Sequence, residues 1–115
     1  MKAIQAAYRG GYDALRLVDI PQPQSRAGQA LVRVTSAGVT PLDRTVLAGL
    51  HPTARKLPLV PGNEGAGVVI EDSFWTFSAG ERVLFFAGPG GVTQDGTFAK
   101  MASEGRVCSG ARTQQ

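Results

Sequence analysis

The segment from Leu57 to Val69, LPLVPGNEGAGVV, constrains the fold most, because it places two prolines and three glycines around one Asn and one Glu. Proline fixes its own φ angle and lacks a backbone N–H, whereas glycine reaches conformations that are closed to other residues. We expect Pro58 and Pro61 to stiffen an extended approach. We expect the glycines to let the backbone turn tightly into a strand over residues 65–71; they are Gly62, Gly65 and Gly67.

Short apolar segments between turn residues recur along the chain, as in a β-rich domain. Gly accounts for 15 of the 115 residues and Pro for 7, which favours turns and short strands over long helices. The clearest strand is 29–37, QALVRVTSA, where apolar and polar residues alternate with a period of two. The other expected strands are 2–7, 14–20, 65–71, 82–86 and, with weaker patterns, 96–102 and 106–108.

One short helix is expected over residues 41–48, PLDRTVLA. Thr40 is a suitable N-cap, Pro41 takes the first helical position, Asp43 lies in the first turn and Gly49 follows the end. These elements predict a small, mainly β domain with one helix, either a barrel or a folded sheet, over residues 1–108. The polar residues 109–115 are expected to form a frayed tail.

Charge and hydropathy argue against two classes of partner. The net charge is +3, and its Lys and Arg residues are scattered, so we expect no nucleic-acid partner. No run approaches the roughly 18 apolar residues that span a membrane, and the first residues lack a signal-peptide core, so we expect no membrane anchor. Cys108 is the single cysteine, which excludes an internal disulfide; we expect a cytoplasmic protein.

Several motifs in order resemble a known family: MKAIQAAYRGGYDALRLVDIP, QALVRVTSAGVTPLDRTVLAG, LPLVPGNEGAGVV, AGERVLFF and DGTFAKMAS. Together they resemble the N-terminal part of the medium-chain dehydrogenase/reductase superfamily, in particular its zinc-independent, NADPH-dependent quinone oxidoreductases. The resemblance covers about residues 1–108. It implies a GroES-like fold, a twisted, partly open β-barrel with one short helix. In that family a Rossmann domain follows in sequence and carries the dinucleotide.

No such dinucleotide-binding domain is expected in this chain. A dinucleotide fingerprint needs a strand before its glycines and a helix after them. The glycine cluster at 87–92, AGPGGV, precedes VTQDGTF, which lacks helical spacing, so a flexible hairpin loop is favoured. We expect a truncated chain that alone binds no cofactor and transfers no hydride, although the resemblance implies NADPH for full-length relatives. Surfaces that the missing parts normally cover are expected to make it a homodimer.

The resemblance also locates candidate site residues. The zinc-dependent branch has Cys and His ligands where this chain has Thr40 and Asn63. Neither a hydroxyl nor a side-chain amide substitutes well for them, so we expect no metal. Glu64 remains, and a salt bridge or a loop hydrogen bond is favoured for it over a role in an active site.

In zinc-free relatives an Asn and nearby tyrosines line the nicotinamide and quinone pocket. Here Thr40 replaces the Asn, while Thr45 and His51 occupy the approximate tyrosine positions. The candidate cofactor-binding residues, given a dinucleotide-binding domain, are therefore Thr40, Thr45 and Asn63. His51 is the catalytic candidate, because an imidazole can donate a proton to a reduced quinone oxygen. The alternative for His51 is an exposed loop residue.

Two further readings stay open. One is a self-associating or partner-binding module without enzyme activity, and the other is a fragment of a longer polypeptide that acts only when whole. For the aromatic residues Phe74, Trp75 and Phe77 a cover over the core is favoured over a ligand platform, and an interface contact is the further alternative.

Overall fold

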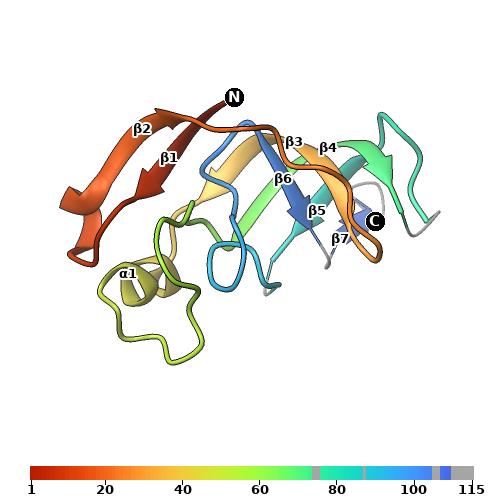
Figure 1. Cartoon of the computed structure of the whole chain (residues 1–115). Helices are drawn as coiled ribbons and strands as arrows, with labels where there is room; N and C mark the ends of the chain where they lie inside the picture. Colours follow the sequence, from red (N-terminus) through yellow and green to blue (C-terminus); the bar gives the residue numbers. More distant parts are fainter. Residues whose placement is uncertain (74–75, 87, 105–106, 110–115) are drawn as a thin grey trace.

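Two antiparallel sheets and one α-helix make up the computed structural model of the chain (Figure 1), which describes residues 1–73, 76–86 and 88–104 and the backbone of 107–109. The smaller sheet pairs β1 (Lys2–Ala6) with β2 (Leu15–Asp19), and a 3-10 turn, η1 (Gly11–Ala14), joins them. The larger sheet has the strand order β6-β3-β4-β5-β7. Its strands are β3 (Ala30–Gly38), β4 (Glu64–Asp72), β5 (Arg82–Phe85), β6 (Met101–Glu104) and β7 (Val107–Ser109).

Strand β1 connects the two sheets. The N–H of Ala6 donates to the carbonyl of Leu59 at 2.9 Å, and the N–H of Ile4 donates to the carbonyl of Phe98 at 2.7 Å. β1 therefore pairs with β2 along one edge, and along its other edge with the two segments that lead into β4 and β6. This arrangement is the mainly β, partly open fold expected from the sequence, and that expectation is confirmed.

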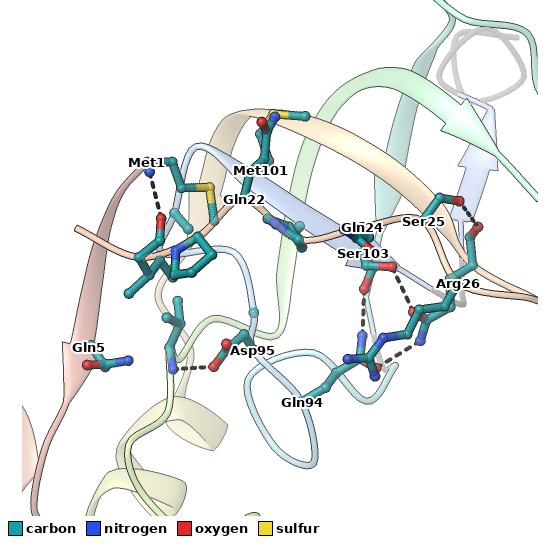
Figure 2. A pocket seen from close by; sticks show the side chains of 18 of the residues that line it. Met1, Gln5, Gln22, Gln24, Ser25, Arg26, Gln94, Asp95, Met101 and Ser103 are labelled. Atoms are coloured by element: carbon teal, nitrogen blue, oxygen red, sulfur yellow. Dashed lines mark hydrogen bonds between the residues drawn. The ribbon is translucent and has the colours of Figure 1, made fainter. Parts of the chain in front are cut away.

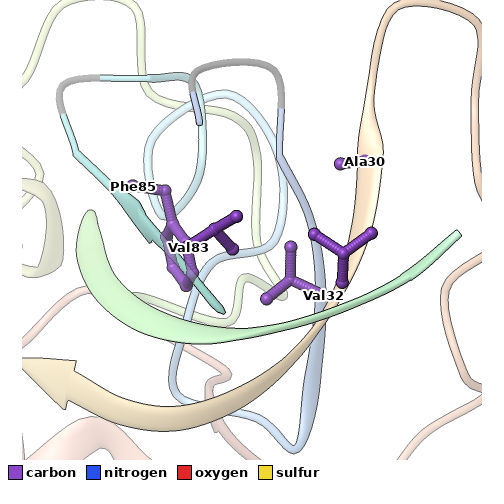
Figure 3. Packing of buried hydrophobic residues seen from close by; sticks show 5 residues of the cluster. Ala30, Val32, Val83 and Phe85 are labelled. Atoms are coloured by element: carbon purple, nitrogen blue, oxygen red, sulfur yellow. The ribbon is translucent and has the colours of Figure 1, made fainter. Parts of the chain in front are cut away.

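The main core lies on one face of the larger sheet (Figure 3), where five buried side chains pack together: Ala30, Val32, Val69, Val83 and Phe85. They come from β3, β4 and β5, and Phe77 packs against them from the loop between β4 and β5. Phe77 therefore covers the core, as the favoured reading predicted. Phe74 and Trp75 lie outside the described residues.

The helix α1 (Pro41–Leu47) begins and ends close to the predicted limits. Its N-cap is Thr40, Pro41 is its first residue, and Gly49 follows with a φ of 79°, in the left-handed region that favours glycine. On the buried side, Val46 packs with Leu59 and Val92 in a second cluster. The helix is thus fixed to the loop before β4 and to the loop between β5 and β6.

One strand prediction was wrong in part. Residues 96–102 were expected to form a strand, but β6 begins only at Met101. The N–H groups of Gly96, Thr97 and Phe98 donate instead to the carbonyls of the 60–62 segment at 2.8 to 3.1 Å. That pairing holds these residues beside the approach to β4, so only the residues after them are free to pair with β3. The expected tail, 109–115, lies outside the described residues apart from the backbone of Ser109, which ends β7.

The glycines of the 57–69 segment also differ in role from the prediction. Gly62 has a φ of 104° and makes the expected turn. Gly65 and Gly67 lie inside β4 without a left-handed φ. They are needed for close approach instead: a Cβ on Gly65 would lie 2.6 Å from the carbonyl oxygen of Ser36, and one on Gly67 would lie 2.6 Å from a methyl of Val32.

Candidate functional site

Thr40 and the 61–64 segment, both named by the sequence analysis, are held by one buried carboxylate. Asp43 is 1% exposed. Its Oδ2 accepts the N–H of Thr40 at 2.8 Å, and its Oδ1 accepts the N–H of Gly62 at 3.2 Å. Asp43 therefore caps the helix and positions the residue before Asn63. Its place in the first turn signalled the cap, but nothing in the sequence signalled the bond to Gly62.

Asn63 is buried and holds a glycine loop. Its Nδ2 donates to the carbonyl of Gly88 at 3.0 Å and to that of Gly90 at 2.9 Å. Both hydrogens of the amide are used in these bonds, so its remaining capacity toward a ligand is that of an acceptor. The structure thus gives Asn63 a scaffold role, and its role in cofactor binding stays a prediction.

The hydroxyl donors of Thr40 and Thr45 differ in how strongly they are already engaged within the fold. The hydroxyl of Thr40 takes part in the capping box of α1, and as a donor it makes a long contact, 3.4 Å, with Oδ2 of Asp43 among the described residues. The hydroxyl of Thr45 donates to the carbonyl of Pro41, one turn earlier, at 3.1 Å. A hydroxyl has one donor, so Thr40 is better able than Thr45 to donate to a bound molecule.

His51 lies in the turn that follows the helix. Its Nδ1 lies 3.3 Å from the N–H of Thr53 and 3.3 Å from the hydroxyl of the same residue. Because a backbone N–H can only donate, Nδ1 accepts, and the neutral ring carries its proton on Nε2. Nε2 is therefore the atom from which His51 can donate. The hydrogen bonds of this side chain within the described residues do not reach Thr40, Thr45 or Asn63.

The glycine loop, residues 88–94, is closed on itself. The carbonyl of Pro89 accepts the N–H groups of Val92, Thr93 and Gln94 at 3.0 to 3.2 Å. A phosphate cradle needs such N–H groups to point outward, at the start of a helix. No helix follows this loop in residues 88–104. The prediction that this glycine cluster forms a loop, and not a phosphate-binding turn, therefore agrees with the structure.

Three glycines meet where this loop crosses the 61–64 segment, and we call them the glycine junction: Gly62, Gly91 and Gly96. A Cβ on Gly91 would lie 2.7 Å from the backbone of Gly62, and a Cβ on Gly96 would lie 2.6 Å from the nitrogen of Gly91. Real Cβ atoms do not approach so closely. The junction brings three backbone segments into contact behind Asn63.

A cavity of about 760 Å³ lies apart from these residues, between the 20–29 segment and β6 (Figure 2). None of the four candidate residues lines it. Its polar wall is a closed ring of hydrogen bonds: Ser103 Oγ donates to Gln29 Oε1 at 2.7 Å, Gln29 Nε2 to Gln94 Oε1 at 2.8 Å, and Gln94 Nε2 to the carbonyl of Ser103 at 2.5 Å. The sequence analysis missed this ring, because its members are far apart in the chain.

The sequence analysis also missed Glu104, at the end of β6. This residue is 2% exposed, and its Oε1 has no hydrogen-bond partner among the described residues. Burial disfavours the charged form and raises the pKa of the Glu104 carboxyl to about 8. No pattern in the sequence marked it, since β6 was only weakly indicated.

The described part of the chain also bears on metal binding and on membrane insertion. No group of three or more His, Cys, Asp or Glu side chains there is placed to hold a metal ion. No helix there is long and apolar enough to cross a membrane.

Comparison with known proteins supports one family. A sequence profile for the alcohol dehydrogenase GroES-like domain matches residues 26–112. Quinone oxidoreductase of Rattus norvegicus is 33% identical over 107 residues, which cover 89% of this chain and 30% of the rat protein. The synaptic vesicle membrane protein VAT-1 homolog-like of Homo sapiens is 35% identical over 88 residues, covering 75% of this chain and 21% of that protein.

Solved structures agree with the sequence relatives. The quinone oxidoreductase from Coxiella burnetii superposes with a TM-score of 0.81 at 29% identity, over 95% of this chain and 36% of that one. A mycobacterial protein solved in complex with NADPH superposes with a TM-score of 0.80 at 31% identity, over 95% of this chain and 32% of that one. The chain thus spans between 21% and 36% of the length of these relatives.

Proposed function

The chain belongs to the alcohol dehydrogenase GroES-like domain family, and from this membership we propose that it forms the substrate-side wall of a zinc-independent quinone reductase pocket. The observation that carries the proposal is that proteins named quinone oxidoreductase match 89% of the chain. Two further features support it. The positions of the zinc ligands in the zinc-dependent branch hold Thr40 and Asn63, and the amide hydrogens of Asn63 are already bound to backbone.

In this proposal the residues of the chain orient a cofactor and a substrate. NADPH, when bound with the help of a dinucleotide-binding domain, supplies the hydride. Thr40 fits a role as a donor to the nicotinamide carboxamide or ribose, because the donor of its hydroxyl makes a contact as long as 3.4 Å among the described residues. Thr45 and Asn63 offer acceptors. His51 fits a role as proton donor to a quinone oxygen through Nε2, and this leaves proximity and orientation as the main contribution of the chain.

We further propose that the chain alone neither retains NADPH nor transfers a hydride. The described residues contain no strand–glycine–helix unit for the pyrophosphate, and the glycine loop directs its N–H groups onto Pro89. We expect a titration of the 115-residue chain with NADPH, followed by nicotinamide fluorescence, to show binding weaker than about 1 mM.

The control for this titration is a full-length quinone oxidoreductase under the same conditions, which has to bind. Saturable binding by the chain alone at micromolar NADPH would contradict the proposal. Reduction of a quinone by the chain alone would contradict it as well.

A self-associating module is the second candidate function. Large apolar side chains are exposed on the described surface, among them Leu50 at 74%, Leu17 at 71% and Val39 at 67%. Burying such side chains between two copies would be favourable. We propose a homodimer and expect light scattering during size exclusion to give twice the mass of the chain. A constant single-chain mass across a hundredfold range of concentration would argue against it.

We also propose a cytoplasmic location, which the single cysteine supports.

A further inference from the structure

Glu104 places a carboxyl on the core face of the larger sheet. It pairs with Ala30 of β3, and directly paired residues in an antiparallel sheet point to the same face. Ala30 belongs to the main core. The Glu104 side chain therefore lies on the same face as an apolar cluster, 2% exposed, with Oε1 unpartnered. A lone buried carboxylate is costly, whereas its protonated form is tolerated there.

The glycine loop lies directly against this carboxyl. A Cβ on Gly90 would lie 2.8 Å from Oε1 of Glu104 and 3.2 Å from Oε2, so the carboxyl contacts the backbone of the loop. On its other side the loop is held by Asn63, through the carbonyls of Gly88 and Gly90. The glycine loop thus contacts the titratable Glu104 carboxyl and is held by the side-chain amide of Asn63.

No cation among the described residues neutralises the carboxyl. The two ion pairs found there join other residues: Lys2 with Asp19 and Arg55 with Asp95. The charged residues on the elements packed nearest to Glu104 are Arg26 before β3, Arg33 on β3, Glu64, Glu71 and Asp72 on β4, and Asp95 after the loop. Burial is accordingly the cause of the raised pKa of Glu104.

Asp72 lies in the same cross-strand row of the larger sheet as Glu104. Ala30 pairs with both, so the order across the sheet is Glu104, Ala30, Asp72. Oδ2 of Asp72 accepts the N–H groups of Thr76 and Phe77 at 2.8 and 2.7 Å. Asp72 is therefore stabilised as a carboxylate one strand further on, and its negative charge adds no support to ionised Glu104.

We propose that Glu104 makes the closure of the glycine loop pH-sensitive. While its carboxyl is protonated, it stays in the core and the loop remains closed on Asn63. When the carboxyl loses its proton, the carboxylate gains by reaching water, and the backbone at Gly90 is the part of the loop that lies against it. Opening the loop there breaks the two bonds from Asn63 to the carbonyls of Gly88 and Gly90.

The direction of the pH dependence follows from proton binding. With the loop closed the pKa of the Glu104 carboxyl is about 8, and in the open or unfolded chain this pKa returns toward the ordinary value of 4.5. The closed form then binds more protons, so closure is fully favoured below about pH 4.5, weakens as the pH rises and levels off above about pH 8. Linkage over this interval predicts that the open fraction rises about 50-fold between pH 6 and pH 8.

Amide hydrogen exchange of the native chain tests this proposal. The protection factors of Gly90 and Gly91, corrected for the intrinsic pH dependence of exchange, are expected to fall about 50-fold from pH 6 to pH 8 and to change little above that. The Glu104→Gln variant keeps the shape of the side chain without the charge. Its loop is expected to stay protected across the same range.

The Cδ resonance of Glu104 in the unmutated chain provides a readout that does not depend on the variant. A titration midpoint near 8 supports the proposal. A midpoint below 6 overturns it, and so does an equal loss of protection in Glu104→Gln and in the unmutated chain. If the variant does not fold, the carbon titration and the exchange of the unmutated chain still decide the question.

Discussion

Gly96→Ala is expected to destabilise the domain by about 3 kcal/mol, or to prevent folding. The added Cβ would lie 2.6 Å from the nitrogen of Gly91 and 2.8 Å from its Cα. These are backbone atoms, which cannot rotate away as a side chain does. The N–H of Gly91 also donates to the carbonyl of Gln94 at 2.8 Å, so displacing it strains a second bond. Urea unfolding followed by circular dichroism measures the change in unfolding free energy.

Gly80→Ala is the matched control. Gly80 has a φ of 90°, and nothing lies within 4 Å of the position of its Cβ. Only the cost of a left-handed backbone is expected there, about 1 kcal/mol. If Gly96→Ala unfolds at the same urea concentration as the unmutated chain, the backbones of Gly96 and Gly91 do not approach as closely as the glycine junction requires.

The local elements could be predicted from the sequence because their signals are local. Thr40, Pro41 and Gly49 lie within one helix length of one another, and they marked the helix to within a residue. The alternation in 29–37 marked β3 in the same way. Such signals act between neighbours in the chain, so a pattern of side chains is enough to show them.

The parts that depend on distant contacts could not be predicted. Where β6 begins depends on the bonds that residues 96–98 make to the 60–62 segment. The need for glycine at 67 depends on the close approach of β3, more than thirty residues earlier. The burial of Glu104 depends on the loop that passes over it. In each case the deciding neighbour is far away in the sequence and leaves no local pattern.

The candidate site was predictable in its positions and not in its interactions. The sequence pointed to Thr40 and Asn63 as informative positions. It did not show that Asp43 joins the N-cap to the residue before Asn63, or that the Asn63 amide holds the glycine loop. These polar groups thus already make hydrogen bonds within the fold, which limits the donors and acceptors that each can offer to a cofactor.

The largest change in activity is expected when the chain is joined to a dinucleotide-binding half. A chimera in which residues 1–104 replace the corresponding segment of rat quinone oxidoreductase, which is 33% identical, would supply the domain that the chain is proposed to need. NADPH binding by the chimera serves as the control for folding. Within it, Thr40→Val removes one donor and is expected to lower kcat/KM about tenfold, a loss of about 1.4 kcal/mol.

The most direct test of the proposed function is the rate of NADPH oxidation by this chimera with a quinone present. We expect a rate that saturates with quinone and is absent from the 115-residue chain alone, because the chain supplies the substrate wall and the partner half holds the cofactor. A chimera that folds and binds NADPH but reduces no quinone would contradict the assignment of this chain to a quinone reductase pocket.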